Sequence, residues 1–541
     1  MNDLPLKTVA ELAQLVRGRD VSPVELTDAF LERIDALDAQ LNAFITVTAE
    51  LAREKARAAE AELMRGAYRG PLHGIPLGLK DIYETAGIRT SAHSKICIDN
   101  IPAQDATATR KLHDAGAVLL GKLATHEFAH GGPSFDLPWP PARNPWHLEH
   151  FTGGSSSGSG AAVAAGLVAG ALGTDTGGSI RTPAAFCGLA GLKPTYGLVS
   201  RAGVIPNSYA LDHCGPLAWT VEDCAILLQA IAGYDSADPG SARVPVPDYR
   251  GALKDHMRGV RIGVVRHFWE DDLKIDAELA RATEAAIDVM KALGAVVETV
   301  RMRPLQEYHD VKTIISMCEL FSTNHQDLVE RPGDFGSDYL GRGGLAGCLF
   351  QGADYVSAQR ERRRMIDEMK PLYERCDVLV TPGAGPAPRL DIHRAVSFWE
   401  RPSFNSPFNV TGAPALIVCC GFSDGMPLGL QMAGRPFDEQ SVLAIGHAYE
   451  RATPWRAQRP VLVPGRTQPP LTPAAPSVDV TGISQSVCDT ARAFASQAGL
   501  ELNDFQFAQL VRAAPHALAM AARIRRRRSR SEEPASVFRV S

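Results

Sequence analysis

The 541-residue sequence lacks several features that would place it in other classes of protein. No run of about 18 apolar residues free of polar residues and glycine occurs, which argues against a membrane-spanning helix. The first residues show no charged segment followed by an apolar one, so we expect no signal peptide. The ten cysteines include no C-x-x-C pair. A reducing, cytoplasmic setting is the simplest context for such cysteines.

Charge and histidine content exclude further classes. Lys and Arg number 56 and Asp and Glu number 61, giving a net charge of −5, so bulk electrostatics favour neither nucleic acid nor an anionic membrane. His126 and His130 are four residues apart, but a glycine pair and a loop context argue against a metal site there. The sequence therefore predicts no metal, no cofactor, and neither nucleic acid nor membrane as a partner.

The order of the expected elements predicts the fold class. Apolar residues make up 45% of the chain, and strands alternate with helices, which predicts an α/β fold with a large mixed sheet covered by helices. Residues 6–65 are expected to be helical, with capping boxes beginning at Thr8 and Ser22. Further expected strands include residues 117–120, 260–265, 296–300, 378–380, 415–420 and 428–432.

A change in amino-acid composition predicts the domain organisation. Residues 464–482 contain several prolines and almost no periodicity, which is typical of a linker. We expect a main domain over residues 1–463, this linker, and a small helical domain over residues 483–541. The basic run from Arg523 to Arg530 is most simply interpreted as charge at a helix end.

Residues 153–195 are the most informative stretch. Two turns rich in glycine and serine flank a run of small residues that carries no charge from Ala161 to Thr174, which predicts burial. The second turn, residues 176–179, precedes a helix expected to begin near Ile180. Backbone N–H groups at such a helix start can converge on an oxyanion. The stretch therefore predicts a serine nucleophile with an adjoining anion pocket.

Lys80 stands at the end of an expected strand, residues 75–79, in which apolar residues alternate with small ones. A lysine at this place most simply reaches solvent. Burying a charged lysine is costly, so a buried lysine either gains hydrogen bonds or has a lowered pKa. With a lowered pKa, the neutral amine becomes available as a base. The residues alone leave both interpretations open.

The sequence of the first Gly/Ser turn partly matches two other known motifs, but neither match is complete. Residues 154–158 match the G-x-S-x-G pattern of α/β-hydrolases, which requires a strand directly before it. A polar loop, residues 145–152, precedes the match here. A phosphate-binding loop would need Gly-Lys followed by Ser or Thr, and none occurs there. We set both alternatives aside.

The same stretch resembles the amidase signature family, and the resemblance covers about residues 5–460. The family pattern consists of Gly-Gly-Ser-Ser, then Gly-Thr-Asp-x-Gly-Gly-Ser-Ile-Arg-x-Pro, then Cys-Gly-x-x-Gly-Leu-Lys-Pro-Thr. Matches occur at residues 153–156, 173–183 and 187–195, with the family's lysine strand at residues 73–76 and 80–81. Ser157 departs from the pattern, since many members have glycine there, which should alter loop packing more than chemistry.

The resemblance implies a catalytic triad and an activity. Ser179 would be the nucleophile, Ser155 the bridging serine in a cis peptide, and Lys80 the base. The implied oxyanion hole consists of the backbone N–H groups of Thr176, Gly177, Gly178 and Ser179. We therefore expect an amidohydrolase that cleaves the C–N bond of a small-molecule carboxamide through a covalent acyl-enzyme.

Substrate contacts are predicted by position in the chain. The candidate substrate-binding residues are Tyr83, His126, Phe128, Ser156 and Arg181, with Phe186 and Trp399 as further candidates for lining a cleft. Arg181 could pair with an acidic group of the substrate, or it could brace the loop through Asp175, and the bracing role is favoured.

The end of the chain, residues 486–539, resembles the small subunit that accompanies some bacterial amidases, including carboxybiuret hydrolases, and that is similar to the C subunit of the tRNA-dependent amidotransferase. The resemblance implies a fused counterpart that stabilises the amidase or its dimer contacts, and hence a homodimer.

Three alternatives to a simple amidase stay open. The first is a carboxybiuret or ureido-amide hydrolase. The second is the glutaminase (A-type) subunit of a tRNA-dependent amidotransferase, which needs separate ATP-dependent and tRNA-binding chains. The third, a catalytically dead scaffold, is disfavoured by the intact Lys80, Ser155 and Ser179.

Overall fold

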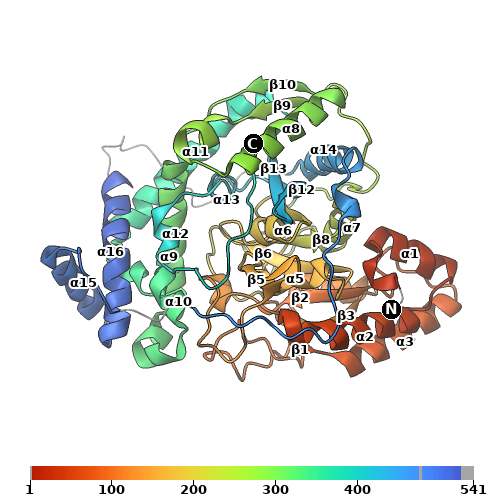
Figure 1. Cartoon of the computed structure of the whole chain (residues 1–541), viewed down its shortest axis with the longest axis horizontal. Helices are drawn as coiled ribbons and strands as arrows, with labels where there is room; N and C mark the ends of the chain where they lie inside the picture. Colours follow the sequence, from red (N-terminus) through yellow and green to blue (C-terminus); the bar gives the residue numbers. More distant parts are fainter. Residues whose placement is uncertain (1–2, 474–477, 525–541) are drawn as a thin grey trace.

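The computed structural model describes residues 3–473 and 478–524, which are built around an eleven-stranded sheet (Figure 1). The strand order is β1-β3-β2-β6-β8-β7-β12-β13-β11-β9-β10. The strands are β1 Phe44–Val47, β2 Pro76–Lys80, β3 Val118–Leu123, β6 Gly170–Asp175, β7 Ala190–Lys193, β8 His213–Ala218, β9 Arg261–Val264, β10 Val296–Thr299, β11 Val378–Pro382, β12 Ala415–Ser423 and β13 Met426–Gly434. A separate two-stranded sheet pairs β4 Arg143–Asn144 with β5 His147–Phe151.

The sheet is mixed, as predicted. Strand β2 runs parallel to both β3 and β6, and β9 runs parallel to β10 and β11. The remaining neighbours are antiparallel. The short strand β1 is a correction to the sequence prediction of helices throughout residues 6–65. Its four residues are only partly buried at the sheet edge, so they carry little apolar periodicity.

Helices cover the sheet on both sides (Figure 1). They are α1 Val9–Gly18, α2 Pro23–Leu41, α3 Ala49–Met64, α4 Thr107–Asp114, α5 Ser157–Ala164, α6 Arg181–Phe186, α7 Val221–Ile231, α8 Ala277–Ala292, α9 Leu305–Glu330, α10 Ser337–Tyr339, α11 Gly352–Arg375, α12 Ser397–Glu400, α13 Ser406–Val410, α14 Glu439–Arg451, α15 Gln485–Gln497 and α16 Asp504–Ile524. Short 3-10 or π segments are η1 Leu4–Leu6, η2 Glu127–Ala129, η3 Phe268–Asp272, η4 Pro332–Asp334, η5 Leu340–Gly344, η6 Ala346–Leu349 and η7 Trp455–Ala457.

Local sequence signals account for several helix starts. The Thr8 hydroxyl accepts a hydrogen bond from the Glu11 amide, and the Glu11 carboxylate accepts one from the Thr8 amide, which is the capping box expected there. At the second site the Ser22 hydroxyl caps α2, and the reciprocal bond from the Ser22 amide to the Glu25 side chain is absent within the described residues. The prediction of a cap is therefore confirmed at both sites, and the full box is formed only at Thr8.

The uncharged run in the centre of the chain folds into α5 and β6 and is buried throughout. Small residues let α5 approach its neighbours closely: a Cβ on Gly158 would lie 2.3 Å from the Ala124 nitrogen and 2.4 Å from the Ala43 oxygen. Because β2 and β6 are parallel neighbours, their carboxyl ends lie at the same edge of the sheet. Lys80 and Thr174 are thereby brought together.

The last two described helices pack against the main part of the chain. Helix α16 contacts α9, η5 and η6, and it runs beside α9 in Figure 1. Arg523 forms two charged hydrogen bonds with Asp310 of α9, of 2.6 and 2.7 Å. The described residues of the expected linker, 464–473 and 478–482, contain no helix or strand. The basic run beyond Ile524 and residues 525–541 lie outside the described residues, and the division into domains stays a prediction.

Among residues 3–473 and 478–524, no helix is long and apolar enough to cross a membrane.

Candidate active site

Lys80 ends β2 as a fully buried side chain, with 0% exposure. Its Nζ donates to the Ser155 hydroxyl at 2.7 Å and to the Thr174 hydroxyl at 2.8 Å. Burial lowers the pKa of Lys80 to about 7, although the carboxylates of Asp212 and Asp175 act in the opposite direction. Of the two interpretations that the sequence left open, the buried one is correct, and a neutral amine is accessible near neutral pH.

The turn that carries Ser155 is joined to the turn that carries Ser179. The Gly154–Ser155 peptide bond is cis, as the family resemblance implies. The Ser156 amide donates to the Ser179 carbonyl at 3.2 Å, and the His126 amide donates to the Ser155 carbonyl at 3.0 Å. A Cβ on Gly154 would lie 2.0 Å from an atom of the His126 ring, so this close approach requires glycine.

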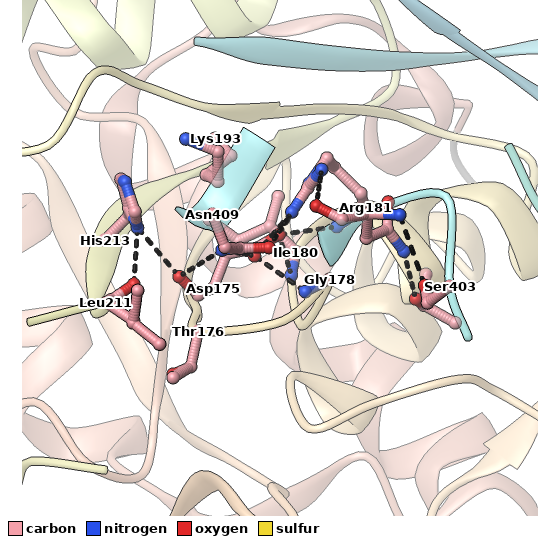
Figure 2. A network of polar contacts seen from close by, with 12 residues as sticks. Asp175, Thr176, Gly178, Ile180, Arg181, Lys193, Leu211, His213, Ser403 and Asn409 are labelled. Carbon is pink, nitrogen blue, oxygen red and sulfur yellow. Dashed lines mark hydrogen bonds and ion pairs between the residues drawn. The ribbon is translucent and has the colours of Figure 1, made fainter. Parts of the chain in front are cut away.

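A buried ion pair shapes the second turn (Figure 2). Asp175, the last residue of β6, accepts hydrogen bonds from the amides of Gly178 at 2.7 Å and Ile180 at 3.2 Å. Its carboxylate also binds the Arg181 guanidinium through bonds of 3.0 and 2.9 Å. Arg181 is fully buried and donates further to Gln431 at 2.7 Å. The structure therefore gives Arg181 the bracing role and not a substrate contact.

The amides of this turn are not all available to an oxyanion. The Gly178 N–H points to Asp175, which corrects its inclusion in the expected oxyanion hole. Within the part of the chain that the structure describes, the N–H groups of Thr176, Gly177 and Ser179 have no acceptor. The Thr176 hydroxyl donates to Asp212 and holds the turn in place. Three of the four expected donors thus remain open.

A cavity of about 330 Å³ opens onto both serines. Besides Ser155 and Ser179, its wall includes His126, Phe151, Phe186, Lys312, Arg342 and Phe398. His126 stacks on Phe151 with ring centroids 5.6 Å apart. Burial, followed by Arg342, lowers the pKa of His126 well below its ordinary value, so the imidazole is neutral. The expected places of His126 and Phe186 at the cavity agree with the structure.

The other candidate substrate residues lie behind the cavity wall. Tyr83 is buried, and its hydroxyl donates to the Gly173 carbonyl at 2.7 Å. Phe128 packs against Phe335 and Tyr339. The Ser156 hydroxyl is 3.3 Å from the Thr174 carbonyl oxygen. These side chains are used within the core, which corrects the expectation for Tyr83, Phe128 and Ser156. Trp399 is also buried outside the cavity lining, whereas its neighbour Phe398 lines it.

Several cavity residues were not predicted, among them Lys312 of α9, Arg342 of η5 and Phe398 of α12. They come from segments more than 130 residues after the serine turns. The one local signal is a lysine within an apolar helical run, which a helical-face analysis of α9 would have found. No group of three or more His, Cys, Asp or Glu side chains suited to a metal ion occurs among the described residues.

Comparison with models of protein families shows to which family the chain belongs. A family model described as Amidase matches residues 25–443, well over half of the chain. The chain belongs to the amidase family. It is therefore an enzyme of the group that acts on C–N amide bonds, and the resemblance found in its sequence is confirmed.

The relatives of this chain within the amidase family are named for different activities. The chain is 39% identical over 481 residues to the A subunit of the glutamyl-tRNA(Gln) amidotransferase of Moorella thermoacetica, covering 84% of this chain and 98% of that protein. The native peptide amidase of Stenotrophomonas maltophilia matches with a TM-score of 0.73 and 33% identity over 84% of this chain and 98% of its own.

A second similar structure belongs to a complex described as vestigial and as revealing the evolutionary origins of an s-triazine catabolic enzyme. It has a TM-score of 0.77 and 32% identity, and covers 82% of this chain and 98% of its own. The amidase fold is thus shared across all three, while their named activities differ.

Proposed function

We propose that this chain hydrolyses the C–N bond of a small-molecule carboxamide by way of an acyl-enzyme on Ser179. The observation that carries the proposal is the fully buried Lys80, whose amine bonds to the Ser155 hydroxyl at 2.7 Å and has a pKa of about 7. A neutral amine in this place is a suitable general base, because its pKa lies close to the working pH.

The chemical steps follow from these groups. Neutral Lys80 takes a proton from Ser155, which takes one from Ser179, and the Ser179 oxygen forms a bond to the amide carbon. The carbonyl electron pair moves onto oxygen, where the N–H groups of Thr176, Gly177 and Ser179 stabilise it. Collapse breaks the C–N bond, and the proton held by Lys80 passes through Ser155 to the leaving nitrogen. Water then cleaves the ester and releases the carboxylic acid.

The experiment is ammonia release by the purified full chain from a panel of butanamide, benzamide, glutamine and a ureido acid. We expect turnover of at least one of these amides and a loss of about 10⁴- to 10⁶-fold in Ser179→Ala. An unchanged rate in Ser179→Ala would contradict the proposal, provided that the variant keeps its melting temperature.

A second candidate function is the glutaminase component of a tRNA-dependent amidotransferase. The favouring observation is that an identity of 39% extends over 98% of a relative named as the A subunit of such an enzyme. That name includes both a tRNA and a multi-chain assembly, so it does not support the expectation that nucleic acid plays no part. Glutamine as the preferred substrate in the panel, with ammonia release rising when tRNA-binding and ATP-dependent partner chains are added, would favour this candidate.

A further inference from the structure

Two basic side chains in the cavity wall, Lys312 and Arg342, form no direct ion pair with any residue that the structure describes. Lys312 is 6% exposed, and its Nζ lies 4.5 Å from the centroid of the Phe398 ring without a hydrogen bond or ion pair. The Arg342 guanidinium lies 4.8 Å from the same centroid, and its buried Nε has no acceptor. Burying a cation is costly unless it is paired.

The carboxylate nearest in the chain to Arg342 is already occupied. Asp338 accepts a hydrogen bond from the Gly132 amide and pairs with His393 at 2.8 Å. Burial alone would raise the pKa of Asp338, but His393, Arg342 and the Gly132 amide together lower it to about 2. No Asp or Glu is among the described residues that line the cavity, so those residues supply no free anion there.

Two arginines near the cavity form ion pairs with carboxylates, unlike Lys312 and Arg342. Arg181 binds Asp175 at 2.9 Å behind the nucleophile turn. Arg201 binds Asp238 at 2.7 Å in the wall of a separate cavity of about 920 Å³. Lys312 and Arg342 differ from these two arginines because they line the cavity that holds the serines and form no ion pair with a described residue.

Lys312 is also close to the reacting groups. A Cβ on Gly177 would lie 2.6 Å from Lys312 Cε and 3.0 Å from its Nζ, so the amine lies against the turn that offers N–H groups to an oxyanion. The imidazoles around it add no charge, because burial lowers the pKa of His309 to about 3 and that of His130 well below its ordinary value. The basic groups of the cavity lining are thus Lys312, Arg342 and Arg401, together with His393, which pairs with Asp338.

We propose that Lys312 and Arg342 bind a carboxylate at the far end of the amide substrate. The substrate class is then the monoamides of small dicarboxylic acids and ureido acids of similar charge. This inference rests on the proposed amide hydrolysis and specifies its substrate. Free amino acid amides such as glutamine are poor fits, because their ammonium group would enter a cavity with two cations and no carboxylate in its described lining.

Burial and then Arg342 lower the pKa of Lys312 to about 7 in the absence of a ligand. A carboxylate seated between the two cations favours the charged amine and forms charge-assisted hydrogen bonds with both. The same arrangement makes a neutral amide of equal length bind more weakly, since it leaves both cations unpaired.

The first test compares matched substrates on the native enzyme. Succinamate and butanamide differ by a carboxylate in place of a methyl group, and glutaramate and glutamine differ by the ammonium group. We expect kcat/KM to be about 10- to 100-fold higher for succinamate than for butanamide, and higher for glutaramate than for glutamine. Equal values for succinamate and butanamide, or a preference for glutamine over glutaramate, would overturn the inference.

The second test uses Lys312→Met and Arg342→Met, with Lys291→Met on the exposed face of α8 as the matched control. Each cavity variant should lower kcat/KM for succinamate about 10- to 100-fold more than it lowers kcat/KM for butanamide. An equal loss with both substrates would place the lysine at the reacting carbonyl and overturn the inference.

A binding measurement separates this inference from the proposed hydrolysis. In the Ser179→Ala background, calorimetry with succinamate should give a Kd that Lys312→Met weakens about 10- to 100-fold. If the native chain hydrolyses no amide but Ser179→Ala binds succinamate in this way, the carboxylate site stands and the proposed hydrolysis fails. If butanamide is hydrolysed as well as succinamate and bound as tightly, the hydrolysis stands and the carboxylate site fails.

Discussion

Two lysines on adjacent strands are equally buried but have different partners. Lys80 ends β2 and Lys122 lies on β3, in parallel register one residue apart, and both have 0% exposure. Lys122 Nζ forms an ion pair with Asp81 at 3.0 Å and donates to the Thr90 hydroxyl at 2.6 Å. The corresponding contacts of Lys80 are the hydroxyls of Ser155 and Thr174, with no carboxylate of the described residues in direct contact.

The difference separates Lys80, the proposed base, from Lys122, which is held in an ion pair. Burial lowers the pKa of both lysines, and for Lys122 the carboxylate of Asp81 opposes that shift from direct contact. For Lys80 the opposing carboxylates do not contact the amine, and its pKa falls to about 7. A hydroxyl can give up a proton to the amine, whereas a carboxylate only stabilises its charged form. Burial alone therefore does not distinguish the proposed base from an ion-paired lysine, whereas the partners of each lysine do.

The largest expected effect is on catalysis by Lys80→Met. Removing a general base lowers the rate by about 10²- to 10⁴-fold. The free energy of unfolding should change by no more than about 1 kcal/mol, because the lost partners are neutral hydroxyls. Steady-state kinetics and denaturant unfolding measure the two quantities. A variant that keeps near-native turnover at neutral pH would remove Lys80 from the mechanism.

Lys122→Met should show the reverse pattern. The change leaves the Asp81 carboxylate buried without its cation, which costs about 3–5 kcal/mol in the free energy of unfolding, while kcat of the folded fraction stays close to native. Combining it with Asp81→Asn should recover much of the loss, since no uncompensated charge remains. A large fall in kcat with little loss of stability would break the distinction between the two lysines.

A smaller matched effect concerns the threonine beside each lysine. Thr174→Val removes one acceptor of Lys80, and losing such a hydrogen bond is worth about 0.5–1.5 kcal/mol, so kcat should fall about 2- to 10-fold. Thr90→Val removes the hydroxyl partner of Lys122 and should lower stability by a similar energy without changing kcat. The idea fails if the two substitutions affect kcat equally.

Local patterns in the sequence were sufficient to predict the mixed sheet, the strand that ends at Lys80, and a serine nucleophile in the Gly/Ser turns. The choice of Lys80, Ser155 and Ser179 as a triad came from the family resemblance. Their spatial contact follows from the parallel pairing of β2 with β6. The triad's catalytic roles stay a proposal.

Other features depend on contacts between distant segments and have no local pattern. Lys122 is buried by its pairing with β2, and its ion pair depends on Asp81 at the end of that strand. The Gly178 amide is withdrawn from the expected oxyanion hole by Asp175, which itself is oriented by Arg181 and Asn409. Three-dimensional packing decides which acceptor a backbone amide binds. A sequence motif identifies the residues of the turn but does not predict these hydrogen bonds.

The central claim is that neutral Lys80 activates Ser179 through Ser155. Its most direct test is the rate at which a fluorophosphonate labels Ser179 as a function of pH in the native chain, Lys80→Met and Lys122→Met. Because the neutral amine is the active form, labelling should rise about tenfold per pH unit below a pKa of about 7 and level off above it. This rise in labelling with pH should be lost in Lys80→Met and kept in Lys122→Met. An unchanged rise of the labelling rate with pH in Lys80→Met would contradict the role of Lys80 as base.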